Sequence, residues 1–295
     1  MHLDLDLSPF RYDGSRRFST ASAPTRIPDL YEDKKAYKEL MEEYREEIDA
    51  LQSLMYAHNR YGMLLIFQAM DAAGKDGAIG AVMSGINPHG VKVTSFKRPS
   101  ETELEHDYLW RIYPHLPERG SIAIFNRSYY EEVLVVRVHP KILTESQRIP
   151  PEFTADPEQV WQQRYADIAQ LESYLHRNGF VILKFYLHLS KEEQRQRFLD
   201  RIEEPDKNWK FAEGDVKERA FWPQYMQAYE DCINATAAPH APWYAVPADD
   251  KQNARLIIAQ AVLTSLQALD MHYPEVDGAR RDVLAQIRQQ LLDEA

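Results

Sequence analysis

Hydrophobic positions recur along this chain with two different periods. From Lys34 to His58, leucine, methionine and tyrosine recur at helical spacing among many charged residues, which predicts a long amphipathic helix that covers the core. Beyond this helix, short apolar runs alternate with stretches of helical periodicity. The runs are GMLLIFQ, VKVTSF, SIAIFN, VILKFYLHL and PWYAVPA. Buried strands that alternate with helices predict an α/β fold with a mostly parallel, five-stranded sheet covered on both faces.

The ends of these runs predict where a ligand binds. In open parallel sheets, ligands bind at the carboxyl ends of the strands, where the connections to the following helices meet. Functional residues are therefore expected just after Gln68, Phe96, Asn126 and Leu189.

The two ends of the chain have patterns of their own. Residues 1–28 mix proline, serine, arginine and aspartate without periodicity, which predicts an extended arm laid over the body or a partly disordered tail. Residues 29–295 contain no internal repeat and no low-complexity linker, so they are expected to form a single domain. Its last segment, from Asp277, has the pattern of a charged amphipathic helix that serves packing or an interface.

Composition narrows the class of protein. Cys232 is the only cysteine, the N-terminus lacks the basic and apolar regions of a signal peptide, and no apolar run approaches the roughly 20 residues of a membrane helix. A cytoplasmic location without a membrane partner is therefore expected. The formal net charge of −11 argues against nonspecific nucleic-acid binding. A local cluster of cations can still bind an anion, because salt limits the reach of exposed charges to about 8 Å.

The segment LLIFQAMDAAGKDGAIG, residues 64–80, has the pattern of a phosphate-binding loop between a strand and a helix. In such loops, backbone N–H groups and a lysine surround phosphate oxygens. Ala69 stands where glycine is usual, and Asp76 stands where a magnesium-binding hydroxyl is usual, so Asp71 becomes the candidate metal ligand. The alternative is a simple strand-to-helix turn in which Asp71 caps the helix. The phosphate-binding residues are expected to be Ala72, Ala73, Gly74, Lys75, Asp76 and Gly77.

A second candidate group lies in SIAIFNRSYYEEVLVVRV, which predicts a strand running straight into a helix. Arg127 follows the strand and offers a planar fork to phosphate oxygens. Arg137 continues an apolar helical stripe, so it either contacts a ligand, extends past the helix end, or pairs with Glu132 or another carboxylate. Glu131 is close enough to the strand end to reach a substrate, although a solvated helix face is the commoner arrangement.

A third group lies in KEEQRQRFLDRIEEPDKNWKF, residues 191–211. Arg197 and Arg201 are four residues apart on a helix that Pro205 should end. Lys207 and Lys210 follow, which predicts a basic lid over about residues 195–222 that closes on phosphates and excludes water. The alternative is an ordinary charged helix in which Glu193 pairs with Arg197.

These segments together resemble the type 2 polyphosphate kinases from about residue 30 to residue 270. The segments that carry the resemblance are QAMDAAGKDG, FNRSYYEEVLVVRVHP, RIEEPDKNWKF and APWYAVPADDK. The resemblance implies a three-layer α/β/α P-loop kinase fold with a helical lid. It also implies reversible, magnesium-dependent phosphoryl transfer between inorganic polyphosphate and a nucleotide, with Mn²⁺ as an alternative metal.

The resemblance also assigns roles to individual residues. Asp71, Lys75 and Arg127 would be catalytic, with Asp71 at the metal. Phosphate would be bound by Arg127 and Arg137 below the lid and by Arg197, Arg201, Lys207 and Lys210 within it. Asn126 and Glu131 would select the nucleotide, as in the class III subgroup that phosphorylates nucleoside mono- and diphosphates.

The expected partners are inorganic polyphosphate and adenine nucleotides, with guanine nucleotides as a further expectation, and the chain is expected to form a homo-oligomer. Two other functions remain open. The first is an ATP-dependent nucleoside monophosphate kinase, which would share the loop and the fold. The second is a polyphosphate-binding protein without catalytic activity.

Overall fold

The computed structural model of this protein describes residues 5–205, 208 and 213–294. Six strands form one sheet in the order β1-β6-β5-β2-β4-β3. They are β1 (Arg11–Tyr12), β2 (Gly62–Ala69), β3 (Val91–Ser95), β4 (Ile122–Asn126), β5 (Phe180–His188) and β6 (Trp243–Pro247). The predicted α/β fold with a mostly parallel sheet is confirmed, since every pairing except the antiparallel β1–β6 edge is parallel. The count of five strands is wrong by the two-residue β1, which is too short to give a pattern in the sequence.

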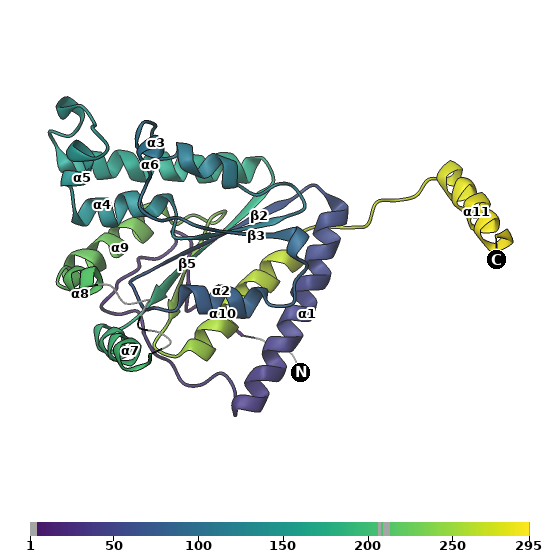
Figure 1. Ribbon diagram of the computed structural model, residues 1–295, viewed down its shortest axis with the longest axis horizontal. Coiled ribbons are helices and arrows are strands. Elements are labelled where there is room, and N and C mark those ends of the chain that lie inside the picture. Colours follow the sequence, from purple (N-terminus) through teal and green to yellow (C-terminus); the bar gives the residue numbers. More distant parts are fainter. Residues whose placement is uncertain (1–4, 206–207, 209–212, 295) are drawn as a thin grey trace.

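Helices cover both faces of the sheet (Figure 1). One face packs against α1 (Lys34–His58), α2 (Lys75–Met83) and α10 (Lys251–Gln267), and the other against α4 (Val135–Val138), α6 (Pro157–Arg177) and α9 (Trp222–Thr236). Successive side chains of a strand point to opposite faces, so β2 supplies both cores: Leu65 and Phe67 to one, Leu64 and Ile66 to the other. The remaining α-helices are α3 (Glu101–Leu104), α5 (Lys141–Glu145), α7 (Lys191–Glu203), α8 (Glu213–Arg219) and α11 (Gly278–Asp293).

The segment VKVTSF differs from its predicted environment. It was expected to be a buried strand, but β3 forms the edge of the sheet and pairs only with β4. Val93 is accordingly 49% exposed. An edge strand can carry the same β-branched residues as a buried one, which is why composition alone did not separate the two.

The connection after β4 also differs from the predicted continuous helix. Arg127 adopts a left-handed backbone conformation, with φ of 61°, directly after the last residue of β4, so the chain changes direction there. A 3₁₀ helix, Tyr129–Val133, and the short α4 then follow one another. The predicted apolar stripe survives this break, because Tyr130, Val133 and Leu134 are all buried.

The N-terminal arm and the C-terminal helix lie differently with respect to the body. The arm runs along α9, where the backbone N–H of Phe18 donates to Asn234 Oδ1 at 2.8 Å and that of Thr20 donates to Glu230 Oε2 at 2.8 Å. The Phe18 side chain is 1% exposed. By contrast, α11 extends away from the body (Figure 1), and its apolar residues are exposed. Among the described helices, none combines the length and the apolar character needed to cross a membrane.

A buried ion pair joins the sheet to the α4–α6–α9 layer. Lys184 Nζ on β5 lies 2.5 Å from Glu172 Oε2 on α6, and the two side chains are 0% and 1% exposed. The lysine also donates to the Thr236 carbonyl at 2.8 Å, while Glu172 Oε1 accepts from the hydroxyls of Tyr129 and Tyr130 at 2.9 and 2.7 Å. Burial lowers the pKa of Lys184, and the nearby Glu172 opposes this shift. Loss of either partner would leave a charge buried without compensation.

We expect Lys184→Met to lower the free energy of unfolding by about 3 to 5 kcal/mol, because Glu172 would remain buried without its counter-ion. Urea unfolding followed by circular dichroism measures the loss. The double variant Lys184→Met/Glu172→Gln is the control, and it should regain much of the lost stability because it removes both charges. A single variant as stable as the unmodified protein would contradict this account of the pair.

Candidate active site

The connection between β2 and α2 has the backbone geometry of a phosphate-binding loop. Ala72 has φ of 64° and Gly74 has φ of 96°, so the chain turns sharply before α2 begins at Lys75. Gly74 occupies the N-cap position of α2 in a conformation that favours glycine. The first turn of any α-helix leaves backbone N–H groups without an intrahelical acceptor, and these groups attract anions. The loop therefore offers amide donors as the sequence predicted.

Lys75 is partly buried beside this loop, and its Nζ donates to the Ala69 carbonyl at 3.1 Å. Burial lowers the pKa of Lys75, as does the charge of Arg127, whereas Asp71, Glu131 and Asp76 act in the opposite direction. The lysine charge is thus held at the loop by a set of surrounding carboxylates.

Arg127 and Asp71 form an ion pair at the centre of the site. Arg127 Nη2 lies 2.8 Å from Asp71 Oδ1, which joins the residue after β4 to the loop after β2. The neighbouring residue Asn126 donates from Nδ2 to Asp76 Oδ1 at 2.5 Å. Two residues at the end of β4 therefore contact two carboxylates of the phosphate loop, and the sequence-predicted residues from these two segments do come together.

A large basic cavity, of about 870 Å³, opens over the loop. Of the residues that the structure describes, seven cationic ones line it: Lys75, Lys97, Arg98, Arg127, Arg201, Lys251 and Arg255. Four of them, Lys97, Arg98, Lys251 and Arg255, were not predicted. Lys97 and Arg98 directly follow the expected strand end at Phe96, which is a signal that could have found them. Lys251 and Arg255 lie four residues apart on α10, but nothing in the sequence indicates that α10 approaches the loop.

A second cavity, of about 380 Å³, adjoins the first and shares Phe96, Lys97, Arg98 and Arg127 with it. Its walls combine apolar side chains such as Val135 and Ile142 with polar ones such as Ser146 and Gln147. Glu131 also lines it, and burial raises the pKa of this carboxyl although Arg127 and Lys75 favour its charged form. The two cavities therefore meet along the residues after β3 and at Arg127, whose ion-pair partner Asp71 lines the larger cavity.

Two predicted phosphate-binding arginines are engaged elsewhere. Arg137 Nη2 pairs with Asp231 Oδ2 on α9 at 2.6 Å, and its Nη1 donates to the hydroxyl of Tyr165. Of the arrangements left open for Arg137 by the sequence, the structure thus shows pairing with a carboxylate other than Glu132. Arg197 is 5% exposed and lies beneath the loop, where it pairs with Glu193 at 2.9 Å. The structure therefore does not bring either guanidinium into the basic cavity.

The predicted lid is described in part. The helix α7 ends at Glu203 just before Pro205, as expected, and Arg201 lines the basic cavity. Lys207 and Lys210 lie outside the described residues. Their predicted contact with phosphate stays a prediction.

The carboxylates of the loop fit a divalent cation of the kind that phosphoryl transfer requires. Asp71 and Asp76 both line the basic cavity. Within the described ranges no group of three or more metal-ligating His, Cys, Asp or Glu side chains occurs. Magnesium in phosphate-transferring sites is bound by one or two carboxylates together with substrate phosphates and water, so a pair of carboxylates is a sufficient protein contribution.

Comparisons with known proteins agree with this geometry. The family model for polyphosphate kinase 2 matches residues 31–274. The chain is 54% identical over 283 residues to an ADP-polyphosphate phosphotransferase of Rhodopseudomonas palustris, covering 96% of this chain and 97% of that protein. It is 41% identical over 251 residues to an AMP/ADP-polyphosphate phosphotransferase of Meiothermus ruber, covering 85% and 89% of the two chains.

A solved structure extends the comparison to three dimensions. The crystal structure of polyphosphate kinase 2 from Arthrobacter aurescens TC1 is similar to this chain, with a TM-score of 0.81 and 36% sequence identity. The alignment covers 91% of this chain and 93% of that one. The likeness therefore extends over most of both chains rather than a single motif.

The two arginines should behave differently when each is replaced by methionine. We expect Arg127→Met to weaken the binding of magnesium tripolyphosphate about tenfold or more, because charge-assisted hydrogen bonds to phosphate are lost. Arg137→Met should leave this affinity unchanged and lower thermal stability, because Asp231 loses its partner. Isothermal titration calorimetry and thermal unfolding measure the two effects. Equal losses of affinity in both variants would show that Arg137 reaches the ligand.

Proposed function

The chain belongs to the polyphosphate kinase 2 family, and on this premise we propose that it transfers phosphoryl groups reversibly between inorganic polyphosphate and nucleoside mono- and diphosphates. The reactions are AMP to ADP and ADP to ATP, with polyphosphate as the donor. The bonds broken and formed are both phosphoanhydrides, so the direction follows the concentrations of the reactants.

The basic cavity is the observation that carries this proposal. Among the described residues, its seven cations come from the start of α2, from the connections after β3 and β4, and from α7 and α10, so they spread beyond the phosphate loop itself. A cleft lined by one sign of charge concentrates ligands of the opposite sign. Several successive phosphates of a linear polyanion would fit this arrangement, whereas the three phosphates of ATP would leave part of it without a ligand.

The smaller cavity suits the nucleoside of the acceptor. Its apolar walls can contact a base, and Ser146 and Gln147 add polar groups. A nucleotide placed there would direct its phosphates toward Arg127, which lines both cavities. Donor and acceptor phosphates would then meet at Arg127, where the cavities adjoin, with Asp71 and Lys75 on the side of the larger cavity.

The chemistry needs positioning and charge neutralisation more than a strong base. A terminal phosphate oxygen of AMP or ADP is already ionised near neutral pH, so it can attack without giving up a proton to the protein. Lys75 and Arg127 would neutralise charge on the transferring group, and the amides of the loop would orient it. Neither a histidine nor a cysteine nucleophile is required by this scheme.

Asp71 would be the principal protein ligand of the divalent cation, which we propose to be Mg²⁺, with Mn²⁺ as a substitute. A bound cation supplies charge neutralisation and alignment of the phosphate oxygens. In the present structure the Asp71 carboxylate pairs with Arg127 at 2.8 Å. To bind the cation, this carboxylate would have to contact both the metal and Arg127, or exchange Arg127 for the metal.

The range of acceptors is the finer part of the proposal. One similar relative is named for ADP alone and another for AMP and ADP. We expect both acceptors here, with Asn126 and Glu131 selecting the nucleotide, because Asn126 contacts Asp76 of the loop and Glu131 faces the smaller cavity. Guanine nucleotides as further acceptors and a homo-oligomeric assembly belong to the same proposal.

Incubation of the purified protein with magnesium, AMP and polyphosphate, without added ATP, tests the proposal directly. Chromatography should detect ADP first and ATP later. Lys75→Ala serves as the control for contaminating kinases and should remove both products. ATP formation from ADP but none from AMP would restrict the acceptor to diphosphates. Phosphorylation of AMP only when ATP replaces polyphosphate would favour the nucleoside monophosphate kinase, and binding without turnover the non-catalytic protein.

Asp71→Asn should raise the magnesium concentration needed for half-maximal activity by about tenfold or more, the scale expected when a metal site is weakened. The amide keeps the shape of the side chain and removes its charge. Activity measured over a magnesium titration gives the result. Asp76→Asn is the matched comparison, since that carboxylate also lines the cavity but is bonded to Asn126. A larger shift in Asp76→Asn would move the metal to Asp76.

A further inference from the structure

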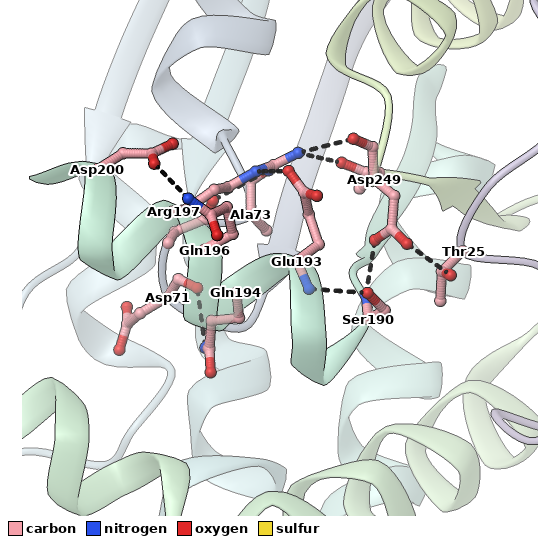
Figure 2. Close-up of polar contacts among 12 residues, drawn as sticks. Thr25, Asp71, Ala73, Ser190, Glu193, Gln194, Gln196, Arg197, Asp200 and Asp249 are labelled. Carbon is pink, nitrogen blue, oxygen red and sulfur yellow. Dashed lines mark hydrogen bonds and ion pairs between the residues drawn. The ribbon is translucent and has the colours of Figure 1, made fainter.

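Side chains of α7 hold three consecutive carbonyl groups of the phosphate loop. Gln194 Nε2 donates to the Asp71 carbonyl at 3.0 Å, and Arg197 Nη1 donates to the carbonyls of Ala72 and Ala73 at 3.1 and 3.0 Å. Figure 2 shows Arg197 reaching Ala73 on one side and Asp249 on the other, with Gln194 turned toward Asp71. These contacts join the first half of α7 to the loop that precedes α2.

The guanidinium of Arg197 has no donor left for a phosphate. Its Nη2 donates to the carbonyls of Ala248 and Asp249 at 2.7 and 3.1 Å, and its Nε donates to Glu193 Oε1 at 2.9 Å. An arginine side chain has five N–H donors, and the bonds to four carbonyls and one carboxylate use all of them. The residue is also 5% exposed. Arg197 therefore acts on the protein backbone.

We propose that Arg197 and Gln194 are positioning residues that turn the amide groups of the phosphate loop toward the substrate. This inference rests on the proposed function, because the loop is taken to bind the phosphates of that reaction. A peptide group is planar, so its carbonyl and its N–H point in opposite directions. Anchoring the carbonyls of Asp71 and Ala73 from α7 therefore directs the N–H groups of Ala72 and Gly74 toward the cavity on the other side. The N–H of Ala73, between them, donates to the Met70 carbonyl at 3.3 Å and closes the turn.

The loop needs such an anchor because its conformation is unfavourable on its own. Ala72 has φ of 64°, a left-handed conformation that is sterically unfavourable for an L-residue other than glycine. Strained conformations of this kind persist only where surrounding contacts enforce them. The two carbonyl bonds from Arg197 to Ala72 and Ala73 supply this enforcement directly.

The anchor is itself held in place by contacts at both of its ends. Gln194 Oε1 accepts from Arg219 Nη1 on α8 at 2.9 Å, which fixes the orientation of the amide. At the start of α7, Asp249 Oδ1 accepts from the backbone N–H of Ser190 at 2.8 Å, and Asp249 Oδ2 accepts from Thr25 Oγ1 at 2.9 Å (Figure 2). The position of α7 relative to the loop is thus set by the β6–α10 connection and the N-terminal arm.

Arginine and lysine should not be interchangeable in this role. A lysine ammonium has three donors on a single atom and cannot span carbonyls on two separate loops, although it keeps the charge. A residue that only neutralises phosphate would tolerate this exchange much better. The same substitution at three arginines of α7 therefore separates anchoring from direct contact.

The experiment compares Arg197→Lys with Arg201→Lys, which lines the basic cavity, and with Arg195→Lys, an exposed control on the same helix. Steady-state kinetics with AMP and polyphosphate gives kcat and KM. Hydrogen exchange gives the protection that magnesium tripolyphosphate confers on the amides of residues 72–78. Circular dichroism and thermal unfolding report whether each variant folds.

Arg197→Lys is expected to lower kcat about a hundredfold, the size of effect that a misplacement of about 1 Å can cause, and to remove most of the ligand-dependent protection. Arg201→Lys should act mainly on the KM for polyphosphate, and Arg195→Lys should match the unmodified protein. The inference is wrong if Arg197→Lys keeps its kcat and its loop protection.

A second variant covers the case in which Arg197→Lys does not fold. Gln194→Met removes the bond to the Asp71 carbonyl together with the bond from Arg219 that orients the amide, and it leaves the contacts of Arg197 in place. It should lower kcat about tenfold with a matching loss of loop protection. Unchanged values for both would overturn the inference. If the unmodified protein fails to use polyphosphate at all, the proposed function is wrong, while the protection by tripolyphosphate and its loss in these variants still decides the anchoring role.

Discussion

The strand β2 pairs in parallel with β4 on one side and with β5 on the other. This pairing places the loop, Arg127 and the start of α7 together at the carboxyl ends of the central strands. Phe67 lies opposite both Asn126 and Phe185 in the register. The phosphate loop, Arg127 and the start of α7 therefore leave their strands at nearly the same level. A slip of one strand by two residues would keep every side chain on its own face of the sheet but separate the loop from Arg127 and from α7.

Electrostatic balance explains how a loop that carries carboxylates could bind an anion, as we propose. Lys75 and Arg127 carry like charges, and the charge of Arg127 lowers the pKa of Lys75. Nearby carboxylates oppose this shift because they favour the protonated, charged lysine. Asp71, Asp76 and Glu131 provide this compensation in the protein without substrate. On the proposed function, entering phosphates would take over part of that role, and the carboxylate of Asp71 would become free to bind a cation. The net charge of the whole chain has little influence on this local exchange.

The parts of the site that depend on local sequence could be predicted, and those that depend on helix packing could not. The loop after β2 and Arg127 after β4 are fixed by strand ends. For Arg137 and Arg197 the spacing correctly indicated a helix face, but not that α9 or the underside of the loop would cover it. Lys251 and Arg255 were missed for the converse reason, since only the packing of α10 brings them to the cavity. The broken helix after β4 was missed because an arginine rarely adopts positive φ.

The left-handed backbone of Ala72 and Arg127 has a consequence for how this chain could be made more stable. In the described part of the chain, four residues other than glycine have positive φ, and these two lie in the site. Glycine at either position would relieve about 1 kcal/mol or more of backbone strain. At Arg127 the same change would delete a cation that lines both cavities and the partner of Asp71. Directed evolution for heat resistance alone would therefore favour changes here that reduce activity, so such a campaign should select for turnover at the same time.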